Sequence, residues 1–177
     1  MKLLLLTVLS AALPLAAQVD PLEGVWQGYD GELLHVSRQV IALAEKIPAE
    51  TYAYRPAPGV RSTAEVFMHI VSANYGLLSR TGPKLPPAVE VPNFEQSVTA
   101  KAEVIDWLKR SFEAVKIEHP KVKHADFARK VKIGKYTGTV DGIYLRILVH
   151  ANEHMGQLVA YARVNGIVPP WSETPAK

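Results

Sequence analysis

Two histidines, His150 and His154, are the residues of this sequence best placed to do chemistry. Residues four apart on a helix share one face, with Cβ atoms about 5–6 Å apart, so two imidazoles at this spacing can converge on one metal ion. Burial of an imidazole is costly unless its nitrogens are satisfied, and a metal ion satisfies one nitrogen of each ring. The pair lies on an apolar stripe of helical spacing, whose other members are Ile143, Ile147, Leu158 and Tyr161.

A metal site needs a third protein ligand, and His69 is the best candidate. It lies in the middle of a second helical segment. Its neighbours one to two turns away include the small residues Ser72, Ala73 and Gly76, which leave room for a cavity. A three-histidine site with an open coordination position is typical of catalytic rather than structural metal ions.

Three residues near the histidine pair are candidates for supporting roles. Gln157 and Tyr161 are expected to hydrogen-bond within the site and so orient a ligand. Glu153 completes the pattern H-x-x-E-H, which matches an inverted zinc-peptidase motif and makes this glutamate a weak candidate for the general base. Glu153 lies about 60° around the helix from His150, however, so a solvent-facing position is expected. His119 and His124 are expected to be solvated.

Four segments with helical periodicity must position these residues. Ser62 and Glu65 form a predicted capping box at the start of the second segment, and Thr139 is the predicted N-cap of the fourth. The sequence therefore predicts an all-α four-helix bundle with long loops after the second and third helices. A short helical turn and an extended piece both remain open for residues 121–138. The four expected helices span residues 31–47, 62–81, 98–117 and 140–164.

The N-terminus has the pattern of a secretory signal peptide. Lys2 is followed by the apolar run 3–15 and by Ala16 and Ala17, so residues 1–17 are the predicted signal and residues 18–177 a single domain. An exported protein, periplasmic or secreted and without a stable membrane anchor after signal removal, is expected. A retained membrane anchor is the alternative. The sequence has no cysteine, which excludes a lipoprotein anchor, disulfides and thiolate metal ligands.

The charge balance does not indicate a nucleic-acid partner. Lys and Arg number 20 against 17 Asp and Glu, a net charge of +3. Much of the positive charge lies between residues 116 and 135, without the interleaved aromatic residues that stack on bases. We therefore predict no nucleic-acid binding.

Two stretches resemble the DinB-like superfamily of four-helix bundles, which includes the YfiT-like metal-dependent hydrolases. They read YRPAPGVRSTAEVFMHIVSANYGLL and HANEHMGQLVAYARVNGIVPP. The resemblance lies in an arginine–proline loop, a capped helix with a central histidine, and a histidine pair followed by Gly-Gln-Leu. It implies that His69, His150 and His154 match the family's three metal ligands. A homodimer is plausible for this family, and related bundles include transferases that use cytoplasmic thiols, a chemistry that export disfavours.

Three functions are consistent with these features. The first is a metal-dependent hydrolase acting on a small-molecule substrate through one divalent ion. Zinc and nickel suit imidazole ligands best, and iron, manganese and cobalt are also compatible. The second is a non-catalytic metal-binding bundle, in which the ion contributes to folding. The third is a metal-free helical interaction module.

Overall fold

The computed structural model describes residues 27–84 and 86–173 of the chain. The predicted signal peptide, residues 1–17, lies outside the described residues. Within these ranges, no helix is long and apolar enough to cross a membrane. The long helices are α1 (Gly28–Lys46), α2 (Thr63–Thr81), α4 (Lys101–Glu118) and α5 (Val140–Val164).

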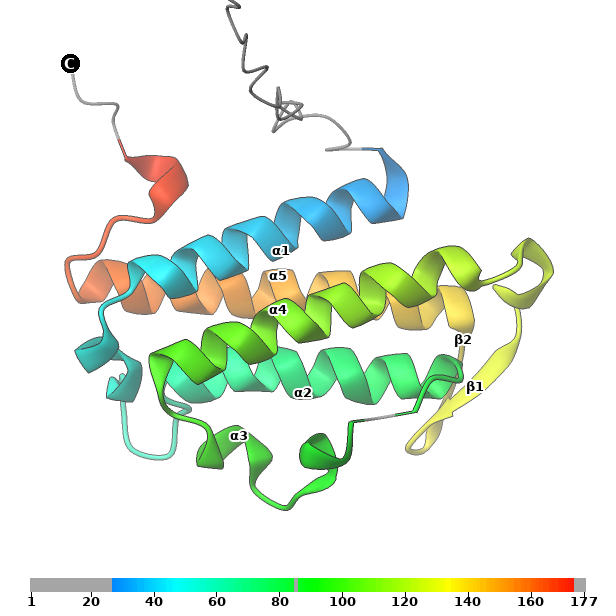
Figure 1. The fold of residues 1–177 in the computed structure, drawn as a ribbon, viewed down its shortest axis with the longest axis horizontal. Helices are drawn as coiled ribbons and strands as arrows, with labels where there is room; N and C mark the ends of the chain where they lie inside the picture. Colours follow the sequence, from blue (N-terminus) through cyan, green and yellow to red (C-terminus); the bar gives the residue numbers. More distant parts are fainter. Residues whose placement is uncertain (1–26, 85, 174–177) are drawn as a thin grey trace, which may run out of the picture.

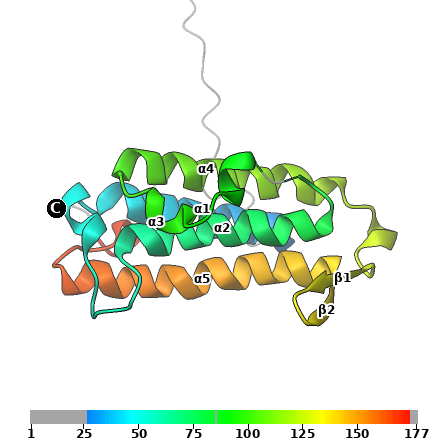
Figure 2. The same ribbon diagram turned by 90° about the horizontal axis from the view of Figure 1, so that it is seen from below.

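The four long helices form a bundle, which confirms the predicted all-α fold (Figure 1). α2 packs against α4 and α5, and α1 packs against the same two helices. α1 and α2 therefore lie on one diagonal of the bundle, and α4 and α5 lie on the other (Figure 2). α2 and α5 are neighbours that run antiparallel, so the middle of one helix faces the middle of the other.

Apolar stripes from all four long helices meet in one core. The apolar residues of the stripe predicted on α5 are buried, and so is His150, whereas His154 is half-buried. Burial of such a stripe is the main source of helix stability in a bundle. The largest fully buried side chains are Tyr144, Phe67, Leu43, Ile47, Met68, Ile70, Leu108, Ile143, Ile147 and Leu158.

The connection from α2 to α4 is more structured than a plain surface loop. It contains a 3₁₀ turn (Pro87–Glu90) and the short helix α3 (Phe94–Ser97). The third helix, predicted from residue 98, begins at Lys101. Val98 has an extended backbone and buries its side chain, so it separates α3 from α4 instead of starting the helix.

The segment left open by the sequence contains both a short 3₁₀ turn (His124–Asp126) and a β-hairpin. β1 (Lys130–Ile133) pairs antiparallel with β2 (Tyr136–Thr139), and Gly134 at the turn has a positive φ of 56°. The hairpin lies at the end of the bundle where α2 finishes and α5 begins (Figure 1). Thr139 ends β2 and also caps α5, because its side chain accepts a hydrogen bond from the Gly142 N–H.

The start of α2 is fixed by several polar contacts. The capping box predicted for Ser62 and Glu65 is present, with both reciprocal hydrogen bonds. Arg55, in the preceding loop, donates two parallel hydrogen bonds to the Glu65 carboxylate and one to the Val60 carbonyl. The hydrogen bonds from Arg55 hold the pKa of Glu65 below its usual value. These contacts fix the loop before α2 to the first turn of the helix.

Replacing Ser62 by alanine removes the acceptor for the Glu65 N–H. Loss of an N-cap hydroxyl typically costs about 1 kcal/mol, so we expect the free energy of unfolding to fall by about that amount. Ser79→Ala is the matched control, because the Ser79 hydroxyl donates to the Gly76 carbonyl within α2 and caps nothing. Its effect should stay within about 0.5 kcal/mol. Urea unfolding followed by circular dichroism measures both, and equal losses would contradict the capping role.

Candidate metal centre

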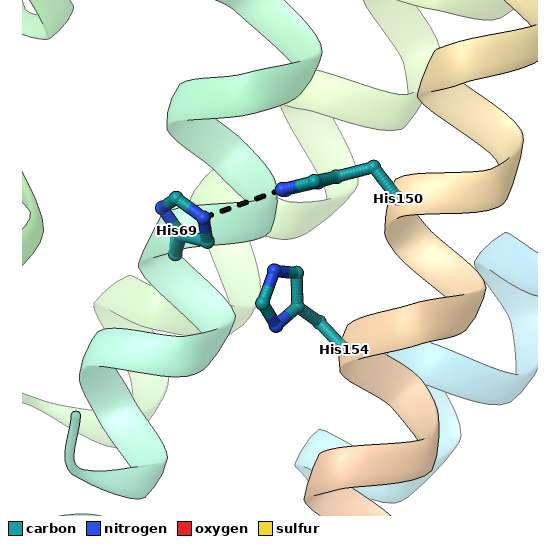
Figure 3. Close-up of side chains that lie close together, drawn as sticks. All are labelled: His69, His150 and His154. Carbon is teal, nitrogen blue, oxygen red and sulfur yellow. Dashed lines mark hydrogen bonds between the residues drawn. The ribbon is translucent and has the colours of Figure 1, made fainter. Parts of the chain in front are cut away.

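Three histidine side chains converge between α2 and α5 (Figure 3). His69 extends from α2, while His150 and His154 extend from successive turns of α5. The Nε2 atoms of His69 and His150 lie 3.2 Å apart, and one nitrogen from each of the three rings lies within 4.8 Å of the others. The structure thus brings together the three residues that the sequence predicted as metal ligands.

The spacing suits a single ion. Nitrogens bound to one zinc ion at about 2.0–2.1 Å in tetrahedral geometry lie about 3.3 Å from one another. The His69–His150 pair is already at about that distance, at 3.2 Å. The widest separation, at most 4.8 Å, has to contract by about 1.5 Å, a movement within reach of side-chain rotation alone.

His69 is oriented by a residue that the sequence did not single out. Glu95 on α3 places Oε1 2.8 Å from His69 Nδ1. An ionised carboxylate only accepts hydrogen bonds, so His69 carries a proton on Nδ1, and in the neutral ring the lone pair is then on Nε2, which faces the other two histidines. Burial alone would raise the pKa of Glu95, but the hydrogen bond from His69 and the charge of Arg61 lower it overall.

A second chain of hydrogen bonds orients His154. The donor and the acceptor of each bond in it follow from the backbone carbonyl at its far end. The Arg61 carbonyl can only accept, so the Tyr161 hydroxyl, 3.3 Å away, donates to it. Tyr161 in turn accepts from Gln157 Nε2 at 2.8 Å, which turns Gln157 Oε1 toward His154 Nδ1 at 2.9 Å. His154 therefore carries its proton on Nδ1, and its Nε2 lone pair is available to a metal ion.

His150 is the most enclosed of the three ligands. Its Nδ1 is buried and has no hydrogen-bond partner among the described residues. Burial, followed by the nearby His154 and His69, lowers the pKa of His150 to about 4. Burial is also the main cause that lowers the pKa of His154. Both rings are therefore neutral near neutral pH, the state in which imidazole binds metals.

These protonation states fit one divalent cation. A neutral imidazole has one lone pair, so the three histidines can supply three nitrogen donors around one point. Glu95 is not a fourth ligand in this arrangement, because its carboxylate contacts Nδ1 of His69, the nitrogen remote from the cluster. The three-histidine group could therefore bind a metal ion and leave a coordination position open.

Glu153 has a partner outside the cluster. Its two carboxylate oxygens accept hydrogen bonds from Arg146 at 2.9 and 2.8 Å, and its side chain is 51% exposed. The hydrogen bonds from Arg146 lower the pKa of Glu153. Glu153 would have to leave Arg146 before it could accept a proton as a general base.

The expectation that His119 is solvated was wrong, whereas His124 is exposed. The His119 side chain is only 15% exposed, and its Nδ1 lies 2.7 Å from Asp30 Oδ1. The 3₁₀ turn that follows α4 packs the ring against Tyr29 and Tyr144. This packing at the bundle end explains the burial, and it needs no metal ion.

Glu95 was missed because nothing in its local sequence places it. It lies in the proline-containing crossover, where periodicity gives no register. The one available signal was that the connection from α2 to the next helix must pass close to α2.

Replacing Glu95 by glutamine should weaken metal binding while leaving the fold intact. The amide cannot hold the proton on His69 Nδ1 as a carboxylate does, and loss of such a partner typically lowers metal affinity about 10–100-fold. Competition with a chromogenic chelator measures the affinity. Glu90→Gln removes the same charge from the same crossover at an exposed position and should have no effect. Equal affinities for the Glu95→Gln variant and the wild type would contradict the orienting role.

Known proteins show the same architecture. A family profile described as the DinB superfamily matches residues 32–158. A DinB-like protein from Bacillus cereus is 21% identical with a TM-score of 0.66, and the match covers 80% of this chain and 95% of that one. A DinB-like protein from Bacillus subtilis is 18% identical with a TM-score of 0.61, covering 84% and 99%.

At these identities the two crystal structures support the fold alone. No curated protein matches the sequence. The family profile, in contrast, spans most of the chain, from α1 to the turn of α5 that follows His154. On this evidence the chain belongs to the DinB superfamily.

Proposed function

We propose that this protein binds one divalent metal ion on His69, His150 and His154 and hydrolyses a small molecule there. The observation that supports the proposal is the convergence of three imidazole side chains between α2 and α5. Two of these rings have their remote nitrogen engaged by Glu95 and Gln157, which leaves Nε2 for an ion. Carboxylate and amide partners of this kind commonly accompany metal-ligating histidines.

Zinc or nickel suits this donor set best. Imidazole nitrogen is a borderline donor that both ions bind well, and iron, manganese and cobalt also accept it. Three protein ligands with an open position are the arrangement of catalytic zinc sites, whereas structural sites have four.

The protein's own residues would orient the reacting groups. Lewis-acid activation of water near neutral pH is the chemistry that such an ion supplies when bound. Glu95 would hold the His69 proton at Nδ1, and Gln157 would do the same for His154. The His69 side chain is 22% exposed, so the cluster is in contact with solvent.

A metal-free interaction module is the alternative that one observation favours. The 3.2 Å contact between His69 and His150 can be a hydrogen bond in which His150 Nε2 donates. The His150 Nδ1 atom has no partner among the described residues in either state, because it is a lone pair without a donor in one and an N–H without an acceptor in the other. A non-catalytic metal-binding bundle would share the ligands but show no turnover.

Metal content separates these alternatives. The wild-type protein, purified without a histidine tag, should contain about one ion per chain, as a single three-histidine site requires. His69→Ala should contain little, because two ligands remain. His124→Ala removes an exposed histidine outside the cluster and should bind metal as the wild type does. Absence of metal from the wild type, even after incubation with zinc or nickel, would contradict the proposal.

Turnover then distinguishes a hydrolase from a structural metal protein. Chelator treatment should abolish hydrolysis in a screen of small esters, amides and phosphate esters, and added metal should restore it. The metal-stripped sample must remain folded by circular dichroism. Activity retained after removal of the metal would contradict the hydrolytic mechanism.

We also propose that the protein is exported, on the evidence of residues 1–17 alone. Expression of the full chain in a bacterium should yield a product cleaved near Ala17. Mass spectrometry of the purified product measures the new N-terminus. An intact chain recovered from the cytoplasm would contradict export.

A further inference from the structure

Arg61 lies at the junction of the two hydrogen-bond networks that orient the metal ligands. Its Nε donates to Glu95 Oε2 at 3.2 Å, and Glu95 contacts His69 through its other oxygen. Its backbone carbonyl accepts from Tyr161, the end of the chain that begins at His154. The guanidinium is thus separated from His69 by a single carboxylate.

The terminal nitrogens of Arg61 have no protein partner among the described residues, although the side chain lies beside this network. Its side chain is 44% exposed, and its one side-chain hydrogen bond uses Nε. The other two arginines near the cluster differ, because Arg55 and Arg146 each place two nitrogens on a carboxylate of their own. Arg61 is therefore the arginine of this group whose planar edge is available to a ligand.

The net charge around the metal-loaded cluster is positive, which favours the binding of an anion. With an ion bound, the ion, Glu95 and Arg61 sum to about two positive charges, because imidazole binds a metal ion in its neutral form. Arg61 is connected to both sides of the cluster, through Glu95 to His69 and through Tyr161 and Gln157 to His154. A guanidinium edge matches carboxylate and phosphate oxygens with two parallel hydrogen bonds.

We propose that Arg61 binds a carboxylate or phosphate group of the substrate beside the metal ion, so that the enzyme acts on small anionic molecules. The inference rests on the proposed metal-dependent function. The competing interpretation is that Arg61 only holds Glu95 in place. That role would affect metal affinity but not the preference for anions at a loaded site.

The test measures binding of inorganic phosphate and of acetate to the metal-loaded full-length protein by isothermal titration calorimetry. Metal per chain is determined in every sample. Arg61→Gln should retain its metal and bind the preferred anion at least about tenfold more weakly, the loss expected for one charge-assisted pair of hydrogen bonds. Arg61→Lys keeps the charge but not the planar edge, so its loss should be smaller. Arg146→Gln is the control, because it removes an equal charge near His150 that is already paired with Glu153.

Each outcome decides the proposal. A loss of anion affinity confined to the Arg61 variants supports the proposal. The anion that the wild type binds more tightly, phosphate or acetate, identifies the group on the substrate. Equal losses in Arg61→Gln and Arg146→Gln would reduce the effect to general electrostatics and overturn it. Unchanged anion binding in Arg61→Gln, or loss of the metal itself in that variant, would also overturn it. If Arg61→Gln does not fold, wild-type anion affinity in Arg61→Lys overturns the planar-edge argument. A wild type that takes up no metal refutes the proposed function, and the inference fails with it.

Discussion

The three imidazoles that face one another between α2 and α5 carry polar nitrogens that need partners inside the bundle, and the surrounding structure supplies them for His69 and His154. Each ring has two polar nitrogens, and leaving one of them buried without a partner is costly. The nitrogens that point away from the cluster find partners on different elements: Glu95 in the crossover for His69, and Gln157 on α5 for His154. Gln157 is held in turn through Tyr161 by the Arg61 carbonyl in the loop before α2. The cluster therefore couples a helix pair to two of the connections of the bundle.

The fold supplies this arrangement through two simple devices. Antiparallel packing of α2 against α5 brings the middle of each helix to the same level, where His69 meets His150. Arg55 and the capping box then fix the start of α2 and the loop that carries Arg61. Because Arg61 contacts both Glu95 and Tyr161, this single loop sets the position of both networks behind the ligands.

Periodicity and capping signals were sufficient for the long helices and for the pair His150 and His154, and the family resemblance added His69, which the structure brings to the same cluster. The spacing of His150 and His154 is local information, and so is the capping box at Ser62. Glu95 and the β-hairpin depend on how non-periodic segments pack against the finished bundle, which no local pattern encodes. His119 was misjudged for a related reason, since its basic neighbours indicated solvent while its ring packs on Tyr29 and Tyr144.

His69 and His150 are 81 residues apart in a chain that has no cysteine. An ion held by both would close a loop of that length in the same topological sense as a disulfide. Chain-entropy reasoning assigns a covalent bridge across such a loop about 4–5 kcal/mol of stabilisation, an upper limit for a metal bridge. Ligation would therefore act as a reversible cross-link between two segments that are far apart in the sequence. While the ion stays bound, the unfolded chain would contain a closed loop, whereas the metal-free protein would unfold as an open chain.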